Sequence, residues 1–219
     1  VEERWFGQMC ETLLRDGRSF AASKAVVIAV PLAALQRGDI TFSPPLPDSK
    51  RAAIEAFAIH PATKLFVAFD APQWEPSATF LAHTGTLCRW FFPPSSSEAV
   101  AEAYITADRA EAVDAMDGAA LTSLALAELA TLLGKQQAEL AKSHRWTHCV
   151  SWANEPHVYG GYASVRPGCL EDCRQALAAP LDDVLYFAGE ATAWNSNPQT
   201  AHGAIESGLR AAKELQLRA

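Results

Sequence analysis

The stretch Leu185-Tyr-Phe-Ala-Gly-Glu-Ala-Thr192, continued as Asn197-Pro-Gln-Thr-Ala-His-Gly-Ala204, decides the fold. An apolar run ends here at a glycine and a carboxylate, and a loop leads into a segment with helical spacing, which predicts a strand, a loop and a helix. Backbone N–H groups at a helix start are unpaired and carry partial positive charge, so a first turn with small side chains admits an anionic or electron-rich ligand. A closely packed corner without a ligand is the alternative, and spacing alone favours it.

Two further candidate regions lie upstream. Trp152 precedes the run Tyr159-Gly160-Gly161-Tyr162, whose paired glycines allow an unusual backbone path. The aromatic side chains can form a wall for a flat or cationic ligand, or a buried cluster around a turn. Lys64 begins an apolar run, where a lysine is either a surface charge at a strand end or a functional amine beside a binding site. Taken alone, the surface charge is the simpler interpretation.

The rest of the chain alternates between strand and helix patterns. Residues 25–30 are a continuous apolar run, typical of a strand buried on both faces of an α/β sheet. Asp16-Gly17 predicts a tight turn between two strands, and Asp48 is the expected N-cap of a helix. Residues 98–143 are rich in alanine, and their leucine spacing predicts helices. The other expected elements are strands at residues 64–70, 79–92, 150–152 and 184–188, and helices at residues 48–57 and 200–217.

The composition describes an ordinary folded protein and excludes several classes of function. The chain has 219 residues, enough for one large or two small domains, and 49% of them are hydrophobic. Acidic residues outnumber basic ones 25 to 18, and a net charge of -7 gives no reason to expect nucleic acid as a partner. No apolar stretch is long enough for a transmembrane helix, and the first residues do not resemble a signal peptide.

Motifs for metal binding and nucleophilic catalysis are missing from the sequence. The five cysteines are an odd number without a CxxC pair, and they predict neither a disulfide framework nor a zinc site. The six histidines form no HExxH pattern, and no GxSxG motif occurs. We therefore expect no metal site.

Several motifs together resemble the C-terminal half of the FAD-dependent amine oxidases, the family of monoamine, polyamine and L-amino-acid oxidases and histone lysine demethylases. They are Val26-Val-Ile-Ala-Val-Pro-Leu32, Phe42-Ser-Pro-Pro-Leu-Pro47 with Lys50 and Ile54, Lys64-Leu-Phe-Val-Ala-Phe-Asp70 with Trp74, Trp152 to Tyr162 with Ser164, and Phe187-Ala-Gly-Glu-Ala-Thr192 with His202-Gly203-Ala204 and Ser207-Gly208. Their shared order over nearly the whole chain makes the resemblance specific. It implies an α/β fold class, with an α+β substrate domain and part of a Rossmann-like FAD-binding domain.

The resemblance also implies roles for individual residues. Lys64 would hydrogen-bond a water near flavin N5, and Tyr162 would form one wall of an aromatic cage facing the flavin, so both are expected to be catalytic. Glu190 would contact the ribityl or pyrophosphate region. The other FAD-binding residues would be Trp152, Gly161, Gly189, Thr200, Ala201, Gly203 and Ala204. The last four would place helix N–H groups near flavin N1 and O2, where reduction leaves negative charge.

Two departures from the monoamine oxidases modify these expectations. Thr200 is not aromatic where the second wall of the cage would fall, so the cage is expected to be incomplete. Gly161 stands where those enzymes carry the cysteine that is joined to the flavin. Any FAD is therefore expected to be noncovalent.

The chain contains no GxGxxG motif, so the pyrophosphate of FAD has no cradle of the Rossmann type. We therefore expect a partner, either an N-terminal FAD-binding half or another protein chain. Residues 1–35 and 151–219 would belong to the FAD-binding domain, and residues 36–150 to the substrate-binding domain.

The expected function is oxidation of a C–N bond in a small amine or amino acid, by hydride transfer to FAD with oxygen as acceptor. The alternative is a non-catalytic interaction subunit that keeps the fold without FAD.

Overall fold

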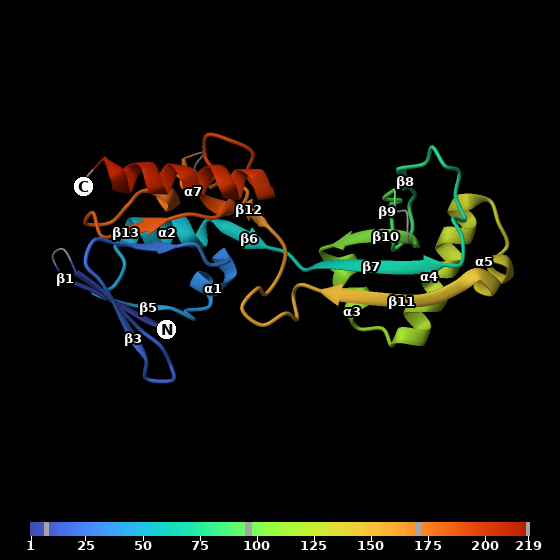
Figure 1. Cartoon of the computed structure of the whole chain (residues 1–219), viewed down its shortest axis with the longest axis horizontal. Helices are drawn as coiled ribbons and strands as arrows, with labels where there is room; N and C mark the ends of the chain where they lie inside the picture. Colours follow the sequence, from blue (N-terminus) through green and yellow to red (C-terminus); the bar gives the residue numbers. More distant parts are fainter. Residues whose placement is uncertain (7–8, 95–97, 170–171, 218–219) are drawn as a thin grey trace. The chain divides into compact units, whose positions relative to one another are not determined.

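The computed structural model describes residues 1–6, 9–94, 98–169 and 172–217. It consists of two compact units (Figure 1). The first unit comprises Val1–His60 and Pro156–Ala219, and the second comprises Pro61–Glu155. Within the described residues, no helix combines the length and the apolar character that crossing a membrane requires.

A four-stranded sheet opens the first unit, in the order β3-β2-β1-β5. Its strands are β1 (Glu2–Phe6), β2 (Met9–Leu13), β3 (Ser19–Ala22) and β5 (Thr41–Ser43). Strands β2 and β3 are antiparallel, and the turn between them contains Gly17 with a φ of 87°. Glycine adopts this conformation at little cost, and the predicted Asp16-Gly17 turn is confirmed.

The rest of the first unit is built around one parallel strand pair, β4 with β13, beside an antiparallel pair, β6 with β12. The bounds are β4 (Val26–Ile28), α1 (Leu32–Gln36), α2 (Asp48–Glu55), β6 (Phe57–Ile59), β12 (Ala163–Val165), α6 (Cys173–Ala178), β13 (Leu185–Phe187), the 3-10 helix η1 (Glu190–Thr192) and α7 (Ala201–Gln216). Ile28, Phe187, Ile54 and Leu177 are among the buried side chains of their common core. This core fixes the ends of β4 and β13.

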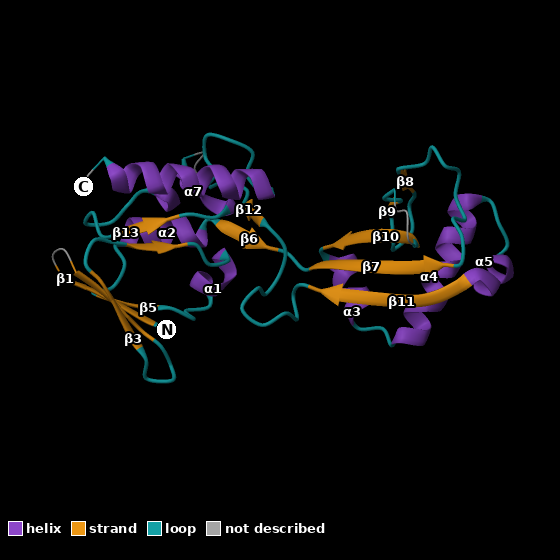
Figure 2. Ribbon diagram, viewed as in Figure 1, coloured by secondary structure: helices purple, strands orange, loops and turns teal. Residues whose placement is uncertain are grey.

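The second unit is a five-stranded antiparallel sheet in the order β11-β7-β10-β9-β8, packed against three helices (Figure 2). The bounds are β7 (Ala62–Phe69), β8 (Phe80–Ala82), β9 (Arg89–Phe91), β10 (Ala99–Thr106), α3 (Asp108–Asp114), α4 (Gly118–Leu133), α5 (Gln137–Ser143) and β11 (His144–Ser151). Leu65 on β7 and Ala103 on β10 pair on the face that packs into the core with Leu129 of α4. Lys64 and Tyr104 pair on the opposite, partly exposed face.

Three predicted elements differ from the structure. Residues 98–143 do not begin as helix, because Ala99–Thr106 form strand β10, in which every second side chain is buried. That period of two is typical of a strand, although the alanines favour helix. Residues 79–92 contain two short strands joined by a loop, and β11 begins well before the strand predicted at residues 150–152.

Asp48 is the first residue of α2 and not its cap. Pro47 occupies the N-cap position without a capping side-chain bond, and Asp48 forms an ion pair with Arg51. The compact units also divide the chain at places other than the predicted domain boundaries, because α2 and β6 pack into the core around β4 and β13. The assignment of the units to flavin and substrate stays a prediction.

Candidate functional site

A cavity of about 320 Å³ lies at the carboxyl ends of β4 and β13 in the first unit. Its lining includes residues 28–33 from the last residue of β4 onward, residues 187–192 from the last residue of β13 onward, the pair Gly161 and Tyr162, and Ala204 of α7. Open α/β sheets bind ligands beyond the carboxyl ends of parallel strands. The sheet topology therefore makes this cavity the first candidate for a binding site.

Glu190 is the carboxylate among the described lining residues, and the fold holds both of its oxygens. Oε1 accepts a hydrogen bond from the backbone N–H of Ala163 at 2.8 Å, and Oε2 accepts one from the N–H of Gln199 at 3.0 Å. Gly189 before it has a φ of 111°, and its N–H donates to Ser207 Oγ at 2.9 Å. Glu190 is thus a fixed acceptor that joins β12 to the loop before α7.

The helix α7 begins where the sequence predicts, and a side chain caps its first turn. Thr200 is the N-cap, and its Oγ1 accepts a hydrogen bond from the N–H of Gly203 at 3.1 Å. A Cβ at Gly203 would lie 2.0 Å from the carbonyl oxygen of Asn197. Gly203 therefore allows the loop to pass close to the first turn, and Ala204 reaches the cavity lining.

A strained loop supplies the other side of the cavity. His157, Tyr159 and Gly160 all have positive φ values, of 67°, 63° and 150°. The loop is held where the N–H of Gly161 donates to the carbonyl oxygen of His60 at 2.9 Å. Positive φ at residues other than glycine is costly and persists where the surrounding structure imposes it. Here it directs the backbone so that Tyr162 lines the cavity.

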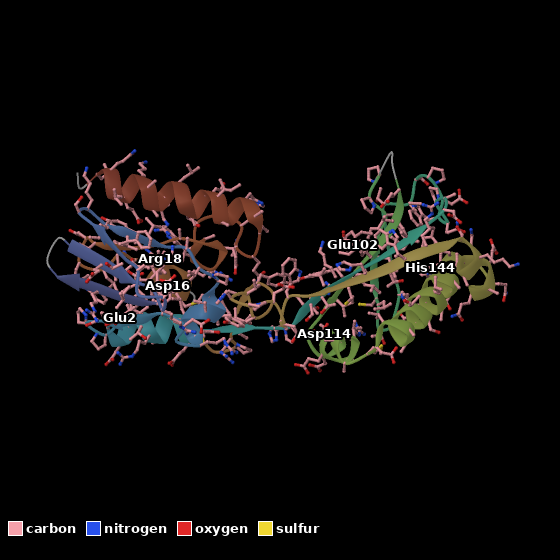
Figure 3. All side chains as sticks on the ribbon, turned by 60° about the horizontal axis from the view of Figure 1, so that its bottom comes forward. Glu2, Asp16, Arg18, Glu102, Asp114 and His144 are labelled. Atoms are coloured by element: carbon pink, nitrogen blue, oxygen red, sulfur yellow. The ribbon has the colours of Figure 1, made fainter. Side chains whose placement is uncertain are left out.

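Lys64 and Trp152 belong to the second unit, so the cavity does not bring them together with the other predicted site residues. Lys64 forms an ion pair with Glu102 of β10, and Glu102 is labelled in Figure 3. The Nζ of Lys64 lies 6.0 Å from the centroid of the Tyr104 ring. Trp152 is exposed and follows β11 directly. Eight of the predicted residues cluster at the cavity and the start of α7: Gly161, Tyr162, Gly189, Glu190, Thr200, Ala201, Gly203 and Ala204.

Three basic residues behind the cavity were not predicted as part of the site; Lys50 and Arg174 are buried, and Arg210 is partly buried. Arg210 donates from Nη2 to the carbonyl oxygen of Phe187 at 2.5 Å and to Thr192 Oγ1 at 3.2 Å. Arg174 donates to the carbonyl oxygens of Ala163 and Ala191. Lys50, which the sequence marks only as part of a motif, donates to the carbonyl oxygens of Ala176 and Leu177 at the end of α6. A lysine among the apolar residues of a predicted helix, as at Lys50, is a sequence signal for such a position, whereas Arg174 and Arg210 carry no such signal.

The described residues contain no group of three or more side chains arranged to hold a metal ion. Among them Cys88, Cys149, Cys169 and Cys173 are free thiols, while the side chain of Cys10 lies outside the description. Burial raises the pKa of the Cys149 and Cys173 thiols, which makes them poor nucleophiles at neutral pH.

A sequence model for the family described as "Flavin containing amine oxidoreductase" matches residues 4–216. The chain belongs to this family. It is 31% identical over 209 residues to polyamine oxidase 2 of Arabidopsis thaliana, covering 93% of the chain and 41% of that protein. It is 27% identical to the human lysine-specific histone demethylase 2, covering 95% of the chain and 26% of that protein.

Solved structures of two oxidases share the fold. A triple mutant of putrescine oxidase superimposes with a TM-score of 0.85 at 20% identity, and cyclohexylamine oxidase from Brevibacterium oxydans IH-35A with 0.84 at 19%. Each superposition covers all of the chain and 48% of the solved structure. The predicted family and α/β fold class are confirmed, and the chain spans less than half the length of these relatives.

The cavity residues fit one part of a flavin dinucleotide. Ribityl hydroxyls are donors, and each Glu190 oxygen retains accepting capacity beside its backbone hydrogen bond. No lysine or arginine is among the described residues that line the cavity, so a pyrophosphate has no cationic partner there. The apolar lining with one fixed carboxylate suits the ribityl and ring portion of the cofactor and not its phosphates.

Proposed function

We propose that this chain forms the C-terminal portion of a flavin-dependent amine oxidase that oxidises a C–N bond of a small amine or amino acid, with oxygen as acceptor. The observation that carries the proposal is the cavity at the ends of β4 and β13, where Glu190, Gly189 and Ala204 meet. When bound, noncovalent FAD would supply the hydride acceptor. The chain's own residues would bind and orient it.

Each cavity residue has a physical role in this proposal. The fixed carboxylate of Glu190 accepts hydrogen bonds from ribityl hydroxyls. Gly161 and Gly189 present backbone without side-chain bulk. The first turn of α7, residues 200–204, directs N–H groups and the positive end of the helix dipole to the site, which favours a ligand that gains negative charge. Tyr162 forms an aromatic wall beside the substrate.

We extend the proposal to an N-terminal FAD-binding half or partner chain that completes the first unit. Parallel strands are normally buried on both faces, yet Val27 of β4 is exposed. On α7, Ile205 and Leu209 are 64% and 66% exposed and lie one turn apart. A partner that covers these apolar side chains would also supply the pyrophosphate cradle. In this arrangement Trp152 would contact the flavin, and the second unit would bind the substrate.

The competing function is a non-catalytic subunit that keeps the fold without flavin. It is favoured by the cavity lining, because no described lining residue is a lysine or arginine that could pair with a pyrophosphate. The purified protein that contains this chain distinguishes the two by its absorbance. We expect flavin absorbance, and we expect acid denaturation followed by filtration to release the flavin, because Gly161 offers no side chain for a covalent bond. A folded, colourless protein would refute the oxidase, and flavin retained on the denatured polypeptide would refute noncovalent binding.

Lys64 is expected to serve oxidation and not folding. In this proposal the Lys64 ammonium would hold a water and assist proton movement during oxidation, a contribution worth roughly 10²-fold in rate. Lys64→Met keeps the apolar stem and removes the charge. Stopped-flow measurement of flavin reduction by amine and reoxidation by oxygen should show one step slowed about 10²-fold, with flavin content and melting temperature preserved.

The control is Lys142→Met, which removes an exposed lysine of α5 in the same unit. It should leave both half-reactions unchanged. Unchanged rates in Lys64→Met as well would reduce Lys64 to the counter-charge of Glu102 on the sheet surface.

A further inference from the structure

A buried guanidinium lies behind the cavity, and the roles assigned above do not account for it. Arg174 stands on α6 and is 8% exposed. Its Nη2 donates to the carbonyl oxygen of Ala163 at 2.8 Å, and its Nη1 donates to that of Ala191 at 3.0 Å. Ala163 follows Tyr162, and Ala191 follows Glu190. One side chain therefore joins the two segments that carry the candidate site.

The surroundings show that this guanidinium is held at a cost. Burial lowers the pKa of Arg174, and the nearby Glu190 carboxylate opposes the lowering. Arginine nevertheless stays protonated in proteins. Its Cζ lies 5.0 Å from the centroid of the Phe57 ring, and none of the ion pairs between described residues includes it. A buried cation without a direct ion pair depends on its carbonyl acceptors.

The C-terminal end of α6 is also held by hydrogen bonds, which fix the helix that carries Arg174. Lys50 of α2 donates to the carbonyl oxygens of Ala176 and Leu177 at 2.9 and 2.8 Å. A helix as short as α6 is marginal in isolation, and tertiary contacts decide whether it forms. The chain of contacts runs from α2 through α6 to the backbone beside Tyr162 and Glu190.

We propose that Arg174 is a positioning residue of the flavin site, which holds the backbone at Ala163 and Ala191 so that Glu190 and Tyr162 keep their places in the cavity wall. This proposal rests on the proposed function, because it assigns Arg174 to the same site. The forked shape of the guanidinium is essential to this positioning role, since its two nitrogens donate to two separate backbone segments at once.

The first test uses hydrogen exchange and needs no flavin. The amides of Ala163 and Gln199 donate to Glu190, so their protection reports where that carboxylate lies. In Arg174→Met, both amides should exchange at least ~10-fold faster than in the wild type. Arg174→Lys keeps the charge without the forked guanidinium, so its amide exchange rates should lie between those of the wild type and Arg174→Met. It also serves as the test variant if Arg174→Met does not fold.

The second test measures the dissociation constant of FAD by quenching of flavin fluorescence, well below the melting temperature of each variant. Arg174→Met should weaken FAD binding ~10-fold or more, as loss of hydrogen bonds from a charged donor predicts. The matched control is Arg166→Met. Arg166 also donates to backbone, but its acceptors are the carbonyl oxygens of Glu55 and Phe57, at 3.2 and 3.0 Å, and not residues next to Tyr162 or Glu190. This control should bind FAD within two-fold of the wild type.

The outcomes separate the positioning role from the proposed function. A wild-type protein that binds no FAD refutes the proposed function. A wild type that binds FAD, with Arg174→Met binding equally well and retaining amide protection, overturns the positioning role alone. A lower melting temperature without either change would also overturn it, because Arg174 would then be a structural residue only.

Discussion

Gly203→Ala is expected to lower the free energy of unfolding of the first unit by about 3 kcal/mol. The new Cβ would lie 2.0 Å from the carbonyl oxygen of Asn197 and 2.9 Å from its carbonyl carbon. Both atoms are backbone, so no side-chain rotation relieves the contact. The loop that ends at Thr200 has to move away from the first turn of α7.

The displacement also reaches the candidate site. The hydroxyl of Thr200 donates to the same carbonyl oxygen of Asn197 at 2.6 Å, and the N–H of Gln199 donates to Glu190. A loop pushed outward breaks the cap and frees one oxygen of the Glu190 carboxylate. Flavin binding is therefore expected to weaken together with stability.

Gly208→Ala is the matched control for Gly203→Ala, since both glycines lie inside α7. A Cβ at Gly208 has no neighbouring atom within 4 Å. Alanine is the better helix former, so this change should stabilise the protein by about 0.5–1 kcal/mol. Urea denaturation of the protein containing this chain compares the variants. A Gly203→Ala protein as stable as the wild type would show that the corner is not closely packed.

The sequence predicts local structure best where one physical signal dominates. Asp16-Gly17 and residues 201–216 formed the predicted turn and helix, because a glycine turn and an apolar stripe each specify one conformation. In residues 99–106 two signals conflict. Alanine favours helix, while alternating burial against α4 favours a strand, and packing outweighs the propensity.

The candidate site was predictable only in part. The glycines and Glu190 stand in recognisable order in the sequence, and the fold gathers them at one cavity. Arg174 and Arg210 were missed, because each acts by donating to carbonyl oxygens of distant backbone. Any residue has a carbonyl oxygen, so no residue type marks the acceptor. Such contacts are visible only when the tertiary structure is known.

Lys50→Met is expected to destabilise the first unit by about 3 kcal/mol at pH 9, because the neutral amine donates two hydrogen bonds at this pH and each buried acceptor left without a donor costs about 1–2 kcal/mol. Lys50 is 2% exposed, and its Nζ donates to the carbonyl oxygens of Ala176, Leu177 and Ala179 at 2.9, 2.8 and 2.5 Å. Ala176 and Leu177 stand in the last turn of α6 and Ala179 is its C-cap, so their carbonyl oxygens have no partner within the helix. Methionine fills the space but leaves them without a donor.

The cost of Lys50→Met should shrink as the pH falls. Burial, with a smaller effect of Arg210, lowers the pKa of Lys50 from 10.5 to about 7 in the folded protein. Between these two values the unfolded chain binds more protons than the folded one, so the lysine's contribution to stability rises with pH. From pH 7 to pH 9 the wild type should gain about 2 kcal/mol relative to Lys50→Met, which leaves a cost of about 1 kcal/mol at pH 7.

Urea denaturation of the wild type, Lys50→Met and Lys24→Met at pH 7, 8 and 9 measures this difference directly. Lys24 is exposed, so its replacement removes the same charge without burial, and Lys24→Met should follow the wild type at every pH. A stability difference between wild type and Lys50→Met that does not change with pH would mean that the ammonium persists in the folded protein. In that case the three carbonyls and the Phe187 ring, whose centroid lies 4.1 Å from Nζ, outweigh the desolvation of the charge.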